Sequence, residues 1–353
     1  MTEPFFSIEG FSTNIIKEVI LDFGTIGSNG VTGPTGSIGP TGSIGPTGSG
    51  SNLVKPNESI AIGTDAGTNQ DLEAVAIGKG AGQTSQGEYS IAIGTNAGNS
   101  NQGLSSVAIG EGAGQTGQGG SSVAIGQNSG QNTQLQNSVA IGANAGQTGQ
   151  QAGSVAIGYY AGETTQGISS VAIGEAAGQR FQKAGSVAIG IFAGYENQEV
   201  SSVAIGHEAG CNTQGTSSVA VGKNAGNSNQ GASSVAIGFG AGYQNQKASS
   251  VAIGEGAGND NQETLSIAVG KNAGNSNQGA GSVAIGENAG ANNQGTNCVA
   301  IGKNAGNSNQ PNDTTCIKPI RDVGNSTPLP TGFKQLAWNP ASGEIIVFGD
   351  FGA

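Results

Sequence analysis

The stretch SVAIGANAGQTGQQAG, residues 138–153, decides the fold, because sixteen variants of it fill most of the 353-residue chain. We take the glycine after Val-Ala-Ile, Gly142 in this copy, as position 0 of the repeat and count the other positions from it. This glycine recurs at Gly63, Gly78 and Gly94 and then every sixteen residues to Gly302, so only the first interval is one residue shorter. Self-similarity at a short fixed period is typical of solenoids and other repeat arrays.

Four features recur in the repeat. Every copy has Ala at position −2, a β-branched Val or Ile at −3 and −1, and a second Gly at +4, and all but one have Ala at +3, where Ser129 is the exception. Alternation of β-branched residues with Ala from −3 to −1 predicts a strand with Val and Ile on one face and Ala on the other. The two glycines predict a tight turn, and the Ala at +3 is expected to start a short return strand. One repeat is therefore one strand–turn–strand coil, and the pattern leaves open whether Val and Ile face the coil interior or the axis of a larger assembly.

Position +8 carries Gln in fifteen of the sixteen copies, and in the short first copy Asp71 stands there with Gln70 beside it. Stacked coils would superpose these amides, so we expect a ladder of hydrogen bonds along the stack. The alternative is an exposed turn residue that was copied with the repeat. The members of this Gln row are Gln86, Gln102, Gln118, Gln134, Gln150, Gln166, Gln182, Gln198, Gln214, Gln230, Gln246, Gln262, Gln278, Gln294 and Gln310.

Positions +1, +2 and +5 vary freely, which predicts an outward rim where recognition could be encoded. Aromatic and large apolar residues gather on this rim in the middle of the array, and they form a candidate contact surface. The alternative is drift at exposed positions. The candidate contact residues are Tyr159, Tyr160, Ile191, Phe192, Tyr195, Phe239 and Tyr243.

Composition argues against catalysis and against several partners. The net charge of −11 disfavours nucleic acid, whose binding needs Lys and Arg, and it disfavours an anionic membrane surface. His207 is the only His, so no Ser-His-Asp or His-metal cluster can form in one chain, and we expect no cofactor and no metal. Three cysteines are no disulfide framework, and Cys298, which stands where other copies have Ser, is expected to be a small buried residue.

The segments on both sides of the array have other patterns. Gly occupies every third position from Gly24 to Gly48, which predicts a collagen-like triple helix, with a Gly/Pro linker as the alternative. Residues 311–353 are expected to form a cap that contains a β-hairpin. Residues 1–23 contain neither a secretory signal nor a membrane span and are expected to anchor the chain in a larger assembly or to form an N-terminal trimer plug. The anchor candidates are Phe5, Phe6, Ile15, Ile16, Val19 and Ile20.

Ser-Val-Ala-Ile-Gly followed by Ala-Gly resembles the head repeats of trimeric autotransporter adhesins of the YadA type, over residues 59 to about 310. The resemblance implies a left-handed parallel β-roll in which three chains pack around one axis. The usual head repeat is about two residues shorter, and the signal peptide and outer-membrane barrel of those adhesins are not seen here. The segments 317–321 and 336–345 resemble instead the closing segment of head-repeat proteins from large DNA viruses and phage fibres.

We therefore predict an all-β homotrimeric fibre with four parts: an anchor segment (1–23), a collagen-like stalk (24–50), a β-roll head (51–310) and a C-terminal cap (311–353). Its expected role is structural, at a virion surface, where it adheres to a host glycan or protein or decorates the particle. It would join a capsid or coat protein through the N-terminal segment. A spore-surface filament is the first alternative. A glycan-degrading enzyme is the second, but it would need paired carboxylates on adjacent coils, and Glu111, Glu175, Glu255 and Glu287 never occupy neighbouring copies.

Overall fold

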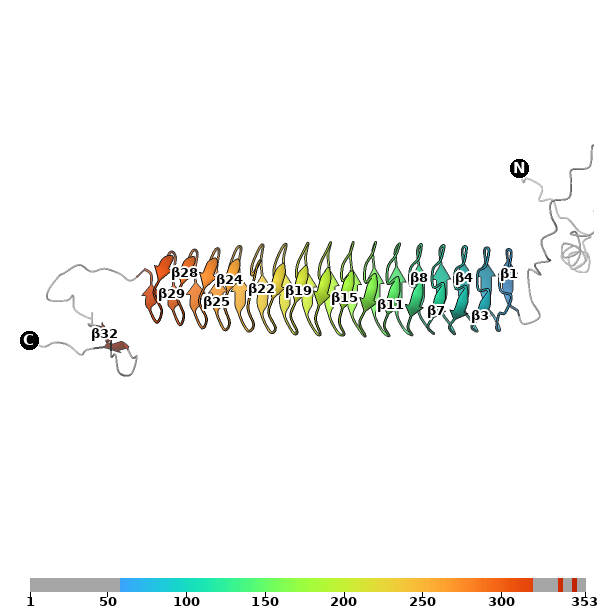
Figure 1. The fold of residues 1–353 in the computed structure, drawn as a ribbon, viewed down its shortest axis with the longest axis horizontal. Helices are drawn as coiled ribbons and strands as arrows, with labels where there is room; N and C mark the ends of the chain where they lie inside the picture. The colour runs from blue at the N-terminus through green and yellow to red at the C-terminus, as the bar shows by residue number, and fades with distance from the viewer. Residues whose placement is uncertain (1–57, 320–335, 339–344, 348–353) are drawn as a thin grey trace, which may run out of the picture. The chain divides into compact units, whose positions relative to one another are not determined.

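The computed structural model describes residues 58–319, 336–338 and 345–347. The anchor segment and the collagen-like stalk lie outside the described residues, so the predictions made for them stay predictions. Within the described part, all regular structure is β-strand, and the repeats form a parallel β-solenoid with one coil per repeat (Figure 1).

The Val-Ala-Ile segments form one long parallel sheet, here called the front sheet. Each strand pairs in register with its equivalent in the next coil, as Val155, Ala156 and Ile157 do with Val171, Ala172 and Ile173. The strands are β1 (Ile60–Ile62), β2 (Val75–Ile77), β4 (Ile91–Ile93), β6 (Val107–Ile109), β8 (Val123–Ile125), β10 (Val139–Ile141), β12 (Val155–Ile157), β14 (Val171–Ile173), β16 (Val187–Ile189), β18 (Val203–Ile205), β20 (Val219–Val221), β22 (Val235–Ile237), β23 (Val251–Ile253), β25 (Ile267–Val269), β27 (Val283–Ile285), β29 (Val299–Ile301) and β31 (Thr315–Ile317).

A second parallel sheet, the back sheet, is formed by the segments that end in the Gln row. It is divided at Gln244, which makes only isolated bridges to Ser228 and Asp260. The first part contains β3 (Thr84–Gln86), β5 (Ser100–Gln102), β7 (Thr116–Gln118), β9 (Asn132–Gln134), β11 (Thr148–Gln150), β13 (Thr164–Gln166), β15 (Arg180–Gln182), β17 (Glu196–Gln198), β19 (Asn212–Gln214) and β21 (Ser228–Gln230); the second contains β24 (Asp260–Gln262), β26 (Ser276–Gln278), β28 (Asn292–Gln294) and β30 (Ser308–Gln310).

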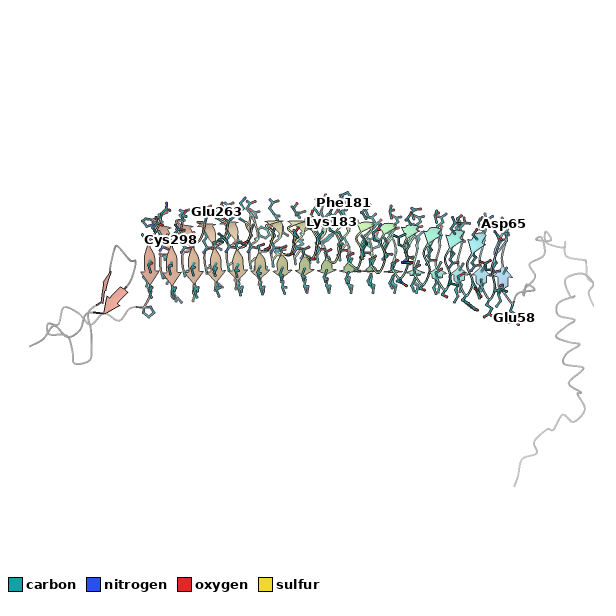
Figure 2. All side chains as sticks on the ribbon, turned by 90° about the horizontal axis from the view of Figure 1, so that it is seen from below. Glu58, Asp65, Phe181, Lys183, Glu263 and Cys298 are labelled. Carbon is teal, nitrogen blue, oxygen red and sulfur yellow. The ribbon has the colours of Figure 1, made fainter. Side chains whose placement is uncertain are left out.

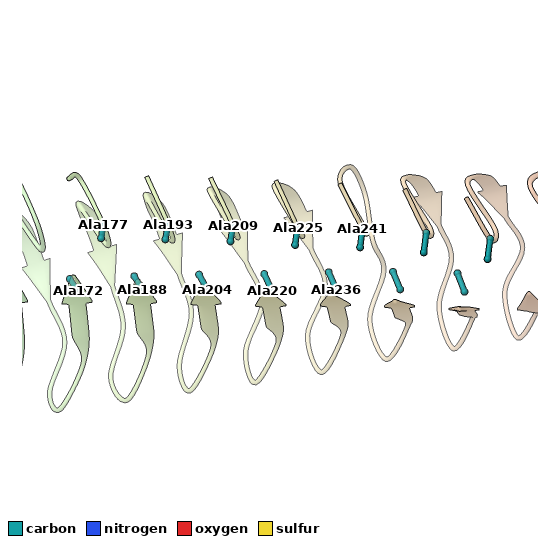
Figure 3. Close-up of a cluster of buried hydrophobic side chains, with 14 of the residues drawn as sticks. Ala172, Ala177, Ala188, Ala193, Ala204, Ala209, Ala220, Ala225, Ala236 and Ala241 are labelled. Carbon is teal, nitrogen blue, oxygen red and sulfur yellow. The ribbon is translucent and has the colours of Figure 1, made fainter. Parts of the chain in front are cut away.

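The core between the two sheets is built from small residues. The Ala at −2 and the Ala at +3 point toward each other across each coil, and both are fully buried in nearly every copy (Figure 3). The apolar core is interrupted between Ala124 and Ala140, where Ser129 replaces the Ala at +3. The Ala side of the Val-Ala-Ile strand therefore points inward, and Val and Ile point outward.

Glycine at position 0 is required by sterics. These glycines have φ between 104° and 129°, and a Cβ on Gly190 would lie 2.7 Å from the backbone oxygen of Gly206 in the next coil. The glycines at +4 have φ near 50°, and a Cβ there would meet the side-chain oxygen of the Gln at +8. The prediction that the return strand starts at the Ala at +3 was wrong. Positive φ at +2 and +4 breaks the extended backbone, so the strand starts at +6.

The roll extends one strand beyond the predicted repeats. In β31, Thr315, Cys316 and Ile317 pair with Val299, Ala300 and Ile301, so Cys316 takes the inward Ala position. The predicted C-terminal hairpin is present as the antiparallel strands β32 (Leu336–Trp338) and β33 (Ile345–Val347). Whether this hairpin caps the roll stays a prediction.

Candidate functional surfaces

The Val and Ile side chains of the front sheet form an apolar surface on the outside of the roll, which we call the Val/Ile face. It consists of positions −3 and −1 of every coil, and its side chains are half-buried or exposed in the single chain. Ile205, Ile237 and Ile285 are 38–40% exposed, whereas the Ala between each Val and Ile is fully buried. Because the strands are stacked in register, this surface runs along the whole described roll. A continuous exposed apolar surface of this length is typical of an interaction site.

The Gln row lies inside the roll and not on an exposed turn. All fifteen side chains are at most 5% exposed. In each described coil, Nε2 donates to the carbonyl of the Val or Ile at −3 of the same coil, as Gln198 does to Val187 at 2.8 Å. In ten coils between Gln118 and Gln294, but not in every coil, Nε2 also donates to the Oε1 of the next Gln at 3.1–3.3 Å. The contribution of this ladder to stability remains a prediction.

The short first coil keeps an amide in the row by a shift of one residue. Gln70, not Asp71, enters the interior, and its Nε2 donates to the carbonyl of Ile60 at 3.1 Å. Its backbone forms a parallel bridge with Gln86, so the missing residue is absorbed before Gln70. The buried amide row therefore begins at Gln70, one coil before Gln86, the first of the fifteen glutamines at +8.

The repeat analysis missed two further polar rows. The Ser at −4 is buried, and in most coils its hydroxyl donates to the carbonyl three residues earlier, as Ser202 does to Glu199 at 2.7 Å. Cys298 occupies this row and is fully buried, as its position predicted. On the outside of the back sheet, successive Asn residues at +7, from Asn229 to Asn309, are linked by side-chain hydrogen bonds. The regular recurrence of Ser and of Asn at these positions could have revealed both rows.

The structure places the candidate contact residues on the outer corner and on the outside of the back sheet. Tyr159 is 52% and Ile191 44% exposed, and Phe239 is 56% exposed. Tyr160, Phe192, Tyr195 and Tyr243 are half-buried. The rings of Tyr159 and Tyr160 meet edge-on with centroids 4.2 Å apart, and those of Phe192 and Tyr195 lie 5.5 Å apart. Phe239 and Tyr243 lie three coils further along and share no ring contact with this group among the described residues.

Two of the four carboxylates considered for a glycan-degrading enzyme form ion pairs with lysines. Glu255 pairs with Lys271 at 3.2 Å and Glu287 with Lys303 at 2.9 Å, both between neighbouring coils. In the part of the chain that the structure describes, no three His, Cys, Asp or Glu side chains come together as a metal site. The segment 112–117, which matches G-x-G-x-x-G, forms a turn and the start of β7, with no helix after it.

Cys211 is a half-buried thiol at +5 of its coil and is not in a disulfide. Burial raises the pKa of this thiol to about 11, and the carboxylates of Glu208 and Glu196 act in the same direction. The thiol is therefore protonated near neutral pH and a poor nucleophile.

Comparison with known proteins gives one family. The YadA head domain repeat matches residues 57–81, 84–97 and 278–305, all within or at the edge of the solenoid. No curated protein and no solved structure matches the chain. Over the described residues there is no helix long and apolar enough to cross a membrane.

Proposed function

We propose that the chain is the subunit of a homotrimeric surface fibre, because three segments of its solenoid match the YadA head domain repeat. Heads of this family are structural adhesins rather than enzymes, and they form homotrimers in general. The proposal has two parts: the Val/Ile face is the trimer contact, and the rest of the roll is displayed outward for adhesion or decoration.

The exposed Val/Ile face is the observation that carries the proposal. Fully burying an Ile side chain contributes about 1.5–3 kcal/mol, so covering the remaining two-fifths contributes about 0.6–1.2 kcal/mol per residue. Repeated over the coils of the roll, this amounts to about 10 kcal/mol or more per chain. That is comparable with the cost of about 4–15 kcal/mol for bringing free subunits together. A trimer that buries this face also fits a collagen-like stalk, which needs three chains.

The displayed surface is then the rim and the outside of the back sheet. Apart from the Asn row at +7, these positions vary from coil to coil while the interior repeats, so they are free to encode recognition without disturbing the stack. We assign the fibre to the surface of a virus particle because the segments 317–321 and 336–345 resemble the closing segment of viral head-repeat proteins. Attachment to the particle would use residues 1–23, and the displayed head would adhere to a host surface or coat the particle.

Charge substitutions on the Val/Ile face test the trimer contact. We expect Ile205→Lys combined with Ile237→Lys to dissociate the trimer, because burying two unpaired ammonium groups per chain is costly. Both side chains are already 38% exposed, so an isolated roll should tolerate Lys there. The control is Asn212→Lys, at an exposed position on the back sheet. Sedimentation velocity should show monomers for the double variant and trimers for the control. Trimers in both would disprove the contact.

The particle assignment has its own test. Gold-labelled antibody against the full chain should label the outside of virus particles, and capsid genes should lie near the gene for this chain. Labelling of spores, or neighbouring sporulation genes, would instead support the spore-surface alternative.

A further inference from the structure

Aromatic residues are concentrated on three successive coils of the roll. We define the aromatic patch as Tyr159, Tyr160, Arg180, Phe181, Phe192 and Tyr195. Five of the eight Phe and Tyr residues between residues 58 and 319 lie in this patch, although it occupies only three coils. Arg180 connects the coils, because its guanidinium carbon lies 5.7 Å from the centre of the Tyr195 ring on the next coil.

Three of these aromatic residues have a backbone conformation that is unfavourable for bulky side chains. Tyr160, Phe181 and Phe192 have φ of 54–56°, the left-handed region that bulky residues rarely adopt. At the same repeat positions most other coils carry Asn or Gly, which adopt this conformation readily. A non-Gly residue held there costs about 1–3 kcal/mol. Folding alone would favour Asn or Gly at all three positions, so the rings point to a role outside the fold.

Phe181 of the aromatic patch faces away from the proposed trimer contact. Phe181 belongs to β15 of the back sheet, its side chain is 48% exposed, and it projects on the side of the roll opposite to the Val/Ile strands (Figure 2). Tyr160, Ala176 and Phe192 occupy equivalent places in successive coils. The backbone bonds from Ala176 N to Tyr159 O and from Phe192 N to Glu175 O hold this register. The backbone positions of Tyr160 and Phe192 are thus two coils apart, about 10 Å at the usual strand spacing.

Polar groups that suit hydroxyl ligands surround the rings. Glu163 and Gln179 lie on adjacent coils, and the Gln179 amide donates to the Glu163 carboxylate. Glu175 and Glu196 flank the rings, so three carboxylates (with Glu163) outnumber the two cations of this region, Arg180 and the exposed Lys183. This negative balance disfavours anionic ligands. A specific protein interface takes about 800 Å² and about 20–30 residues from each partner, more than these few side chains provide.

We propose that the aromatic patch binds a neutral glycan chain that lies along the roll axis. The electron-rich faces of the rings would stack on the C–H faces of sugars, with two coils matching the length of a disaccharide. The carboxylates, the Gln179 amide and the Arg180 guanidinium would bind sugar hydroxyls. This site would be the host contact of the adhesive head, so it rests on the proposed function and names its ligand class.

The test uses the full chain on a printed array of neutral oligosaccharides and their sialylated counterparts, followed by calorimetric titration of the best neutral binder. The patch variant is Tyr160→Asn with Phe192→Asn, which installs the residue that other coils use at this position. We expect at least tenfold weaker binding, together with a higher thermal midpoint, because Asn relieves the backbone strain. A matched pair of variants, Tyr159→Thr and Phe239→Thr, changes rings of 52% and 56% exposure at the same repeat position. Only the first should weaken binding.

Three results would overturn the proposal: no binding anywhere on the array, preferential binding to sialylated sugars, or equal affinity of the Asn variant and the unmodified chain. A separate assay distinguishes this failure from failure of the adhesion function. Beads coated with the chain should adhere to host cells, and the neutral oligosaccharide should compete. If the beads adhere and neither the oligosaccharide nor the Asn substitutions reduce adhesion, the adhesive function stands, but its ligand is a protein and not a glycan. If the beads adhere to no host cell, the adhesive function is wrong. The glycan site is still tested independently by binding on the array.

Discussion

Substitution of one glutamine of the Gln row tests whether the buried amide ladder stabilises the roll. Gln198 is fully buried, and its Nε2 donates to Val187 O at 2.8 Å and to Gln214 Oε1 at 3.1 Å. Its own Oε1 accepts from Gln182 Nε2 at 3.1 Å. Gln198→Met keeps a similar volume but removes all these hydrogen bonds, so it isolates their contribution from that of packing.

The expected cost follows from what the substitution leaves unpaired. Gln214 Oε1 loses its donor in the dry interior, which costs about 1–3 kcal/mol, and the lost bond to Val187 O adds about 1 kcal/mol. Gln182 Nε2 keeps its bond to Val171 O at 2.8 Å, so its loss is smaller. We expect a total of about 2–4 kcal/mol. Gln198→Ala should cost about 2 kcal/mol more, because it also leaves a cavity.

Hydrogen exchange is the suitable assay, because repeat arrays can open locally rather than in one two-state step. In Gln198→Met, backbone amides of residues 187–214 should exchange roughly 30- to 1000-fold faster, which corresponds to the expected loss of about 2–4 kcal/mol. Residues 91–109, several coils away, should be unaffected. The control is Gln127→Met at an exposed position of the rim. Equal exchange in the two variants would refute the stabilising role of the ladder, as would unchanged thermal stability after Gln182, Gln198 and Gln214 are all replaced by Ala.

Three further predictions concern single positions. Gly190→Ala should prevent local stacking and lower the thermal midpoint more than any single rim substitution, because its Cβ would lie 2.7 Å from Gly206 O at a φ of 125°; a midpoint within 2 °C of the unmodified protein would argue against this clash. Cys211 should react with iodoacetamide more slowly in the folded protein than in urea at pH 8, since its pKa is raised from 9.0 to about 11. The folding stability linked to this raised pKa is present below pH 9 and is lost as the pH rises toward 11. Equal alkylation rates in the folded and the urea-unfolded protein would contradict the raised pKa. Lys271→Ala should change stability by less than about 1 kcal/mol in chemical denaturation, because its 3.2 Å pair with Glu255 is exposed; a larger loss would mean that the pair acts within a cooperative network.

The strand and the position-0 turn of each coil could be predicted from the sequence because their causes are local. Alternation of Val, Ala and Ile fixes which side chains share a face, and an invariant Gly within one chain indicates a backbone that excludes a Cβ. The same reasoning placed the Ala at +3 in a strand, which was wrong. The invariant Gly at +4 already indicated a positive φ, but the positive φ at +2 is hidden in coils where residues such as Tyr160 and Phe192 occupy that position.

The location of the core was harder to predict, because large apolar residues usually form the interior. Here the interior is filled by Ala, Ser and Gln, and Val and Ile lie outside. The recurrence of small residues at −2 and +3 contained this information, but the burial of these residues in the structure was needed to interpret it. The aromatic patch was only partly predicted: Tyr159, Tyr160, Phe192 and Tyr195 came from the variable rim positions. Arg180 and Phe181 belong to a strand position that the repeat analysis had not examined.

The mass of the chain in solution tests the central claim most directly. If the Val/Ile face is a subunit contact, light scattering of the full chain at micromolar concentration should give three times the chain mass of 34.4 kDa, about 103 kDa. The value should not change on tenfold dilution, because burial of the apolar face along the whole roll favours the trimer strongly at these concentrations. A mass of 34.4 kDa at micromolar concentration would contradict the trimer and leave the exposed Val/Ile face without its proposed partner.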